Sequence, residues 1–136
     1  MIDKEIIKIA SNTENHGVLD NHTHFSKLKN AICGDEMKVY LIVKNNKIIN
    51  FKYECESCIY CQASVSLLSR KAKSKSIEKV KNFAEQAKNY FDKSSKSRDK
   101  EWKEFDMIMT KNNISRKECL LLPLNATLDA LNNKSL

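Results

Sequence analysis

The fold is decided by residues 36–53, which read EMKVYLIVKNNKIINFKY. Apolar and polar side chains alternate over residues 36–43 and again over residues 47–53, which is the pattern of two half-buried β-strands. Asn45 and Asn46 stand between the two runs. Because asparagine tolerates positive φ, this pair predicts a tight hairpin turn. A lone hairpin is only marginally stable, so other elements must cover its apolar face.

The segments on either side of the hairpin supply that cover. HFSKLKN, residues 24–30, is a candidate third antiparallel strand, and a polar, charged linker is expected over residues 93–100. Apolar residues recur at helical spacing in five segments, which are residues 2–11, 61–72, 76–92, 101–109 and 118–131. The sequence therefore predicts an α+β fold, a small three-stranded antiparallel sheet with helices packed on one face, in a single domain spanning residues 1–136.

The last of these helices contains the chain's only proline, Pro123. Proline is best tolerated in the first turn of a helix, where no backbone donor is lost. We therefore expect the helix to begin close to Pro123. This start would place Cys119 just before the helix N-terminus.

Composition indicates a globular protein with a basic surface. Apolar residues make up 41% and charged residues 30% of the 136 residues, and Lys plus Arg exceed Asp plus Glu by 24 to 17. No apolar run approaches the roughly 18 residues of a membrane span, and the N-terminus lacks the apolar region of a signal peptide. We expect a cytoplasmic protein without membrane contact. Aromatic residues are not interleaved with the basic ones, so we expect a solvated lysine-rich surface and no nucleic-acid partner.

Three of the five cysteines, Cys55, Cys58 and Cys61, fall in YECESCIYCQAS, residues 53–64. In a reducing compartment such a group is more typical of a metal or catalytic site than of disulfides. The stretch is incomplete by itself. A ferredoxin run needs a further cysteine followed by proline, and a structural zinc site needs four ligands. Cys55 is also expected to end a strand while Cys61 enters a helix, so their thiols should diverge.

Other segments offer the missing ligands. Cys33 lies in AICGDEM, two residues before Asp35, and side chains two apart point the same way in extended chain. Cys58 is expected at the turn from sheet to helix, and Cys119 at a second helix start. Helix N-termini favour negative charge, which lowers a thiol pKa. Cys33, Asp35, Cys58 and Cys119 are thus candidate ligands for zinc or an iron–sulfur cluster.

Residues 31–68, AICGDEMKVYLIVKNNKIINFKYECESCIYCQASVSLL, resemble the core of the NifU-like, IscU-type iron–sulfur cluster assembly scaffolds. In that family Cys-Gly-Asp precedes a β-hairpin, a second Cys followed by Ala-Ser opens a helix, and a third Cys precedes a final helix. The matching positions are Cys33-Gly34-Asp35, Cys58 with Ala63-Ser64, and Cys119. The resemblance extends over roughly residues 5–131.

The resemblance implies a scaffold or a zinc-dependent sulfurtransferase rather than a conventional enzyme. It implies a [2Fe–2S] cluster or Zn²⁺ bound through Cys33, Asp35, Cys58 and Cys119. It also implies a cysteine desulfurase as partner, and downstream iron–sulfur apo-proteins or carriers as recipients. We expect Cys119 to be the most exposed thiolate and therefore the sulfur acceptor.

The chain also departs from the IscU type. Cys55 and Ser57 stand where glycines are usual, and Glu118 stands where IscU-type members have His. Arg116, three residues before Cys119, and the long separation of Cys58 from Cys119 are similar to the SufU-like branch. The Leu-Pro-Pro-Val-Lys chaperone motif is absent.

Two alternatives stay open from the residues alone. One is a non-catalytic zinc-binding interaction module whose basic face contacts nucleic acid, which would show salt-dependent binding. The other is a dithiol oxidoreductase that uses Cys55–Cys58 or Cys58–Cys61, although the βαβ context of a thioredoxin-like motif is missing.

Overall fold

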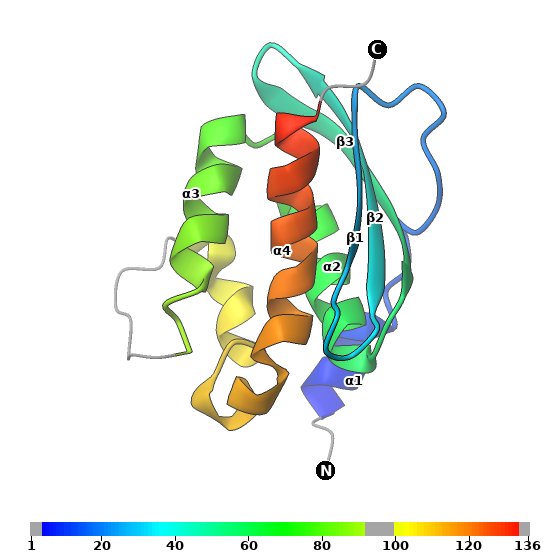
Figure 1. The fold of residues 1–136 in the computed structure, drawn as a ribbon. Coiled ribbons are helices and arrows are strands. Elements are labelled where there is room, and N and C mark those ends of the chain that lie inside the picture. The colour runs from blue at the N-terminus through cyan, green and yellow to red at the C-terminus, as the bar shows by residue number, and fades with distance from the viewer. Residues whose placement is uncertain (1–3, 92–99, 134–136) are drawn as a thin grey trace.

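A computed structural model describes residues 4–91 and 100–133 and shows a sheet with helices packed on one face (Figure 1). Within these residues the sheet is antiparallel and has three strands in the order β1 (His24–Lys29), β2 (Glu36–Lys44) and β3 (Lys47–Glu56). The predicted fold class and its third strand are confirmed. The predicted linker lies almost entirely outside the described residues.

The hairpin that joins β2 to β3 has the predicted two-residue turn. Asn45 and Asn46 have φ values of 54° and 62°, and Lys44 pairs with Lys47 across the turn. Positive φ at both central residues gives a turn whose twist matches that of the strands. The turn therefore sets the register of the residues next to it, and a β-bulge between Ile42 and Val43 shifts the pairing of the rest of β2 with β3 by one residue.

The register directs one row of apolar side chains toward the helices. Met37 pairs with Cys55 and Val39 with Tyr53, and every member of these pairs is buried except Cys55, which is half-buried. Four α-helices of the described chain build the other layer, and they are α1 (Lys4–Ala10), α2 (Ile59–Ala72), α3 (Ile77–Ala87) and α4 (Lys117–Asn132). Helix α4 lies on β1 and β2, α2 lies on β3, and α2 and α4 pack against each other.

The segment predicted as a helix over residues 101–109 forms a 3₁₀-helix instead, η1 (Lys100–Met107), and a second one, η2 (Lys111–Arg116), follows. The buried side chains of η1 are Trp102 and Phe105, which stand three residues apart. This spacing suits the three residues per turn of a 3₁₀-helix as well as an α-helix. Phe83 of α3 stacks on Trp102 with 4.2 Å between ring centroids, so η1 is held by aromatic packing.

The start of the last helix differs from the prediction. Helix α4 begins at Lys117, so Cys119 lies in its first turn and Pro123 lies in its interior. Proline has no N–H, so the helical bond that would end on the carbonyl of Cys119 is absent. The Thr127 hydroxyl donates to the Pro123 carbonyl at 2.8 Å. The early start follows from η2, which runs directly into α4.

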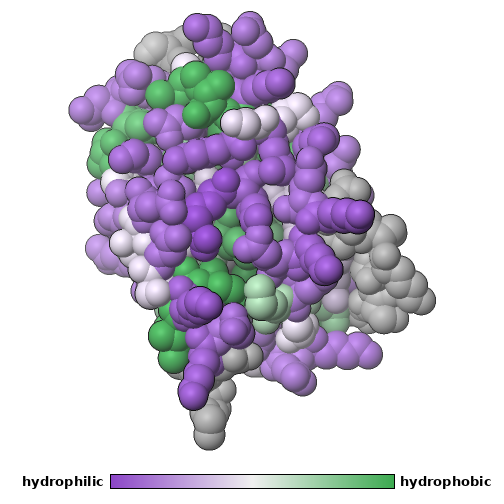
Figure 2. All heavy atoms as spheres, turned by 180° about the vertical axis from the view of Figure 1, so that it is seen from behind, coloured by the Kyte–Doolittle hydropathy of each residue, from purple (hydrophilic) through white to green (hydrophobic). Residues whose placement is uncertain are grey.

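The surface seen from behind is largely hydrophilic, with small separated hydrophobic patches (Figure 2). The large apolar side chains that are exposed are scattered over several elements, and they are Ile7, Val18, Ile32, Ile49, Met107 and Ile114. Among the described residues no helix is both long and apolar enough to cross a bilayer.

Candidate metal centre

Three segments that are distant in sequence meet at one end of the sheet, the lower end in Figure 1. They are the loop over residues 30–35, the connection from β3 to α2, and the first turn of α4. In an antiparallel sheet the β1–β2 loop and the end of β3 lie at the same end. Contacts of α4 with β1, β2 and α2 bring its first turn to that end.

The β1–β2 loop is closed tightly by its own backbone. The Asn30 amide donates to the Asp35 carbonyl, and the Gly34 amide donates to the Asn30 carbonyl, both at 2.8 Å. Gly34 has a φ of 78°, which glycine adopts without steric cost. The reversal leaves the Cys33 side chain exposed and turns Asp35 inward, with only 8% of its surface accessible.

Cys33, Asp35 and Cys119 form a compact group of possible ligands. One ligand atom from each lies within 4.8 Å of the others, and the Cys119 thiol donates to Cys33 Sγ at 3.8 Å. Two thiolates bound at about 2.3 Å to one tetrahedral metal ion lie about 3.8 Å apart. The buried Oδ2 of Asp35 has no hydrogen-bond partner within the described ranges. The donor types, their spacing and this unsatisfied oxygen all fit a thiophilic metal.

Cys58 lies next to this group but outside it. It is the N-cap of α2, and its side chain makes no capping hydrogen bond. Burial raises the pKa of the Cys119 thiol well above its usual range, and the thiols of Cys58 and then Cys33 raise it further through hydrogen bonds and charge repulsion. Cys58 is therefore close enough to Cys119 to act on it, although its sulfur does not complete a group of four within 4.8 Å.

Two expectations about Cys119 are wrong. Its position at a helix start was expected to lower its pKa, but burial and the neighbouring thiols outweigh the helix dipole. It was also expected to be the most exposed thiol, yet only 5% of its surface is accessible, whereas Cys33 is exposed. The raised pKa means that metal binding at Cys119 must release a proton. The role of Cys119 as sulfur acceptor stays a prediction.

Cys55 lies on β3 and Cys61 lies on α2, both at the end of the sheet that carries the other cysteines. Cys61 is fully buried in the core, while Cys55 is half-buried. Burial raises the pKa of both thiols, and the nearby Ser57 side chain opposes this rise. The Ser57 hydroxyl is itself buried, and no hydrogen bond of ordinary geometry engages it within the described residues. None of the five cysteines, all of which lie in the described ranges, forms a disulfide.

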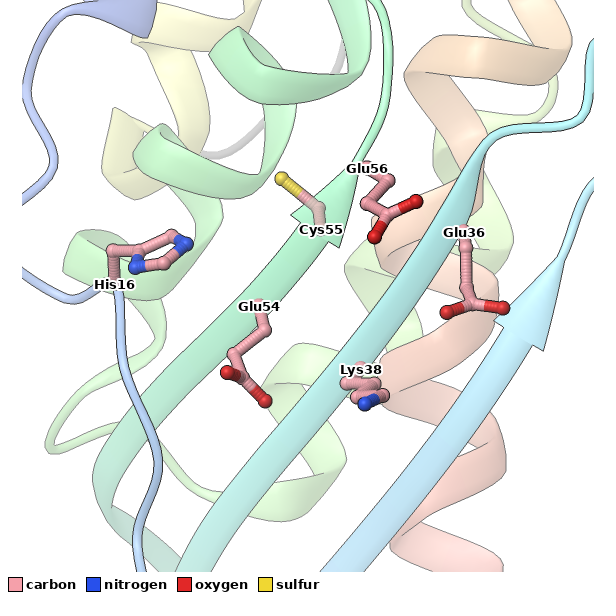
Figure 3. Close-up of a pocket in the computed structure, with 6 residues that line it drawn as sticks. All are labelled: His16, Glu36, Lys38, Glu54, Cys55 and Glu56. Carbon is pink, nitrogen blue, oxygen red and sulfur yellow. The ribbon is translucent and has the colours of Figure 1, made fainter.

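A hollow of about 260 Å³ opens beside Cys55 (Figure 3). It is lined by His16, Glu36, Lys38, Glu54, Cys55 and Glu56. Figure 3 shows the Cys55 thiol pointing away from the carboxylates of Glu54 and Glu36, with His16 reaching over from the loop before β1. The thiol therefore lies on the other face of β3, where a second hollow is lined by Ala10, Thr13, His16, Tyr53, Cys55 and Gln62. Cys61 is fully buried.

Two contacts that sequence reasoning missed join the helix starts that carry Cys58 and Cys119. The Arg116 guanidinium lies over the Tyr60 ring at 5.2 Å from its centroid, and Ser64 Oγ donates to the Leu120 carbonyl at 2.7 Å. Ser64 is fully buried, and a serine among the apolar residues of α2 was the available signal for such a bond. These contacts hold the first turns of α2 and α4 side by side.

Together these features define a small α+β protein with a thiol- and carboxylate-lined site at one end of its sheet. Residues 1–101 match the NifU-like N terminal domain, so the chain belongs to that family. The IscU iron–sulfur cluster assembly scaffold protein of Thermotoga maritima is 31% identical over 87 residues, which are 64% of this chain and 61% of that protein. An uncharacterized protein of Borreliella burgdorferi is 28% identical over 130 residues, 96% of this chain and 82% of its own length.

Solved structures agree on the fold. The N-terminal part of a NifU-like protein from Brucella abortus superposes with a TM-score of 0.83 at 20% identity, covering 96% of this chain and 91% of that one. A putative iron–sulfur cluster assembly scaffold protein for the SUF system from Fervidobacterium islandicum AW-1 superposes with a TM-score of 0.76 at 25% identity, covering 96% of both chains. The predicted family resemblance and sheet-and-helix architecture are thus confirmed.

Proposed function

We propose that this chain is an iron–sulfur cluster assembly scaffold and sulfur acceptor that works with a cysteine desulfurase. The observation that carries the proposal is the approach of Cys33, Asp35 and Cys119 to within 4.8 Å at one end of the sheet. The names of the Thermotoga and Fervidobacterium relatives support it, as does membership of the NifU-like family. The cargo is a [2Fe–2S] cluster, or a zinc ion bound to the same residues.

Each residue has a distinct part in binding. Cys33 and Cys119 supply two thiolates at the spacing of metal ligands. Cys58, at the start of α2, supplies a third thiolate after a small movement toward the group. Asp35 supplies a carboxylate, which is a harder ligand than thiolate and therefore binds a soft iron–sulfur cluster less firmly. A mixed set of this kind suits temporary binding, because one bond is easier to break when the cluster passes to a recipient.

Sulfur uptake follows thiol chemistry. A thiolate of this chain attacks the outer sulfur of the desulfurase persulfide, the S–S bond breaks, and the desulfurase cysteine leaves as a thiolate. Cys119 is the proposed acceptor. Cys33 lies 3.8 Å from it and is exposed, so sulfur that arrives at either thiol lies within reach of the other.

Anaerobic incubation with a cysteine desulfurase, cysteine and ferrous iron tests the proposal. We expect an iron–sulfur chromophore with about two iron and two sulfide per chain. We also expect the chain to enhance desulfurase turnover. A chain that acquires neither a cluster nor a persulfide under these conditions contradicts the proposal.

Mass spectrometry of persulfides identifies the acceptor. The Cys119→Ala variant should lose the added sulfur, while Cys61→Ala should keep it as a matched control. Sulfur retained in Cys119→Ala and lost in Cys33→Ala would assign the acceptor role to the exposed thiol instead.

A further inference from the structure

We infer that Cys55 is an alternative fourth ligand of the metal centre, and that its thiolate takes the place of Asp35 when the carboxylate leaves the metal. The inference rests on the proposed metal centre. It concerns a residue outside the group of Cys33, Asp35 and Cys119.

The strand register places Cys55 beside Asp35. Met37 pairs with Cys55 across β2 and β3, and Asp35 precedes Met37 by two residues. Side chains two apart share a face, so Asp35 and Cys55 lie on the same side and are diagonal neighbours. Such neighbours are about 7–8 Å apart at Cα, within the reach of side-chain rearrangement. The Asp35 carboxylate already acts electrostatically on the Cys55 thiol.

Cys58 links Cys55 to the rest of the centre. It stands three residues after Cys55, at the start of α2, and it interacts electrostatically with both the Cys55 and the Cys119 thiols. With Cys33, Cys58 and Cys119 as ligands, either Asp35 or Cys55 could be the fourth. The end of the sheet thus offers one more ligand than a four-ligand site requires.

The buried hydroxyl of Ser57 supports a charged sulfur at this position. It lies beside the thiols of Cys55 and Cys61 and favours their thiolate forms. It has no hydrogen bond of ordinary geometry within the described part of the chain. It is therefore placed to donate to a metal-bound thiolate of Cys55.

Cys61 is the matched control for Cys55. Both thiols lie beside Ser57 and Asp35, and both are buried enough to have a raised pKa. Cys61, however, has no accessible surface and packs inside the core from α2, while Cys55 lines the hollow at the end of β3. Reaching a metal from Cys61 would require α2 to move, whereas Cys55 needs only its own side chain to turn.

Double substitutions separate the two thiols. We would load wild type, Asp35→Ala, Asp35→Ala/Cys55→Ser and Asp35→Ala/Cys61→Ser with a [2Fe–2S] cluster and measure the cluster lifetime under an iron chelator. Asp35→Ala should keep the cluster at least as long as wild type, because four thiolates then bind it. Adding Cys55→Ser should shorten the lifetime about tenfold or more, whereas adding Cys61→Ser should leave it unchanged.

Cobalt substitution gives a second readout that does not depend on cluster chemistry. The thiolate-to-Co²⁺ charge-transfer band grows with the number of bound thiolates. It should be stronger in Asp35→Ala than in wild type, and the added Cys55→Ser should return it to the wild-type level. Circular dichroism and urea unfolding of the metal-free variants check that each one is folded.

Three outcomes would overturn the inference, and a fourth would refute the proposed function. Equal lifetimes for Asp35→Ala with and without Cys55→Ser overturn the inference, and so does an equal loss from Cys55→Ser and Cys61→Ser. Loss of the cluster from the single variant Asp35→Ala also overturns the inference. Wild-type protein that binds neither cluster nor Co²⁺ refutes the proposed function itself, which is distinguishable because the other outcomes all require a loaded wild type.

Discussion

The two ends of the sheet belong to the same strands, but their polar groups differ in hydrogen bonding. At the hairpin end, the Ile48 amide donates to the Lys75 carbonyl at 2.9 Å and the Ser74 amide returns a bond to the Ile48 carbonyl at 2.7 Å. At the cysteine end, buried oxygens of Asp35 and Ser57 have no hydrogen-bond partner among the described residues. Backbone hydrogen bonds close both ends, but the cysteine end in addition retains buried side-chain oxygens without a partner among the described residues.

This difference distinguishes polar groups that stabilise the fold from polar groups that are available for binding. Buried polar groups are nearly always paired, so an unpaired one needs an explanation. Here the unpaired oxygens coincide with closely spaced thiols, which themselves repel one another as thiolates. These groups fit the cation of the proposed metal centre. The hairpin end needs no such completion.

The largest effect expected is the loss of metal binding from the cysteine end. Cys33→Ala, Cys58→Ala or Cys119→Ala should each weaken Zn²⁺ binding by at least about 100-fold, because even second-shell partners of ligands contribute 10–100-fold. Competition with a chromophoric chelator measures this affinity. Cys61→Ala should change it little, and damage from Cys61→Ala equal to that from Cys58→Ala would show that the ligands are wrongly assigned.

The hairpin end should show the opposite response. Asn46→Ala should lower the free energy of unfolding by about 1–2 kcal/mol, because an ordinary residue at positive φ is strained. Urea unfolding measures this change, and Asn46→Gly serves as the control without strain. Zn²⁺ affinity should be unchanged. A large loss of affinity in Asn46→Ala would mean that the two ends are coupled through the strands.

A smaller effect of unusual sign is expected at Asp35. In the metal-free protein, Asp35→Ala should raise the free energy of unfolding by about 1 kcal/mol, because it removes a buried oxygen that has no partner. Urea unfolding in the presence of a chelator tests this. Destabilisation by Asp35→Ala without metal would show that the carboxylate serves folding and would weaken the contrast between the ends.

The last expected effect is absent near neutral pH and is a fall in stability at alkaline pH. Burial raises the pKa of Tyr40 to about 12, helped by its hydrogen bond to Glu54, and burial raises that of Tyr53 to about 12, helped by Cys55. The unfolded chain loses these protons near pH 10. Stability should therefore begin to fall above about pH 8.5, where the unfolded thiols ionise while burial keeps those of Cys55, Cys61 and Cys119 protonated. The two phenols should steepen the fall between pH 10 and 12, where they are ionised only in the unfolded state.

Urea midpoints measured across that range, together with tyrosinate absorbance, test the alkaline effect. Tyr40→Phe should reduce the slope of stability against pH, because it removes one of the two titrating phenols. An unchanged slope in Tyr40→Phe would contradict the assignment to Tyr40.

Much of the architecture was predictable because its signals are local. The alternation over residues 36–53 and the Asn45–Asn46 turn indicate the hairpin from local signals. The β-bulge between Ile42 and Val43, with Ile48 buried and Ile49 exposed, interrupts that alternation. The segment around Trp102 was less predictable, because a spacing of three residues is compatible with both helix types. Pro123 misled the placement of the last helix, since the chain already turns helically from residue 111.

The candidate ligands were also readable in the sequence, whereas their environment was not. Residue type marks Cys33, Asp35 and Cys119 as candidate metal ligands, but the exposure of each thiol depends on which helix covers it. That is why Cys119 was expected outside and lies inside. The same holds for Cys55, whose access through a hollow depends on the loop that carries His16.

The sequence alone determined the hairpin, the number of thiols and the order in which they occur, because alternation and turn chemistry act between near neighbours. Only the tertiary structure decided that loop 30–35, the start of α2 and the start of α4 meet at one end of the sheet. It also decided that Asp35 turns inward and that Cys55, rather than Cys61, keeps access to that end. Burial is a property of the packed chain, and burial raises the pKa of the Cys55, Cys61 and Cys119 thiols and limits their access to solvent.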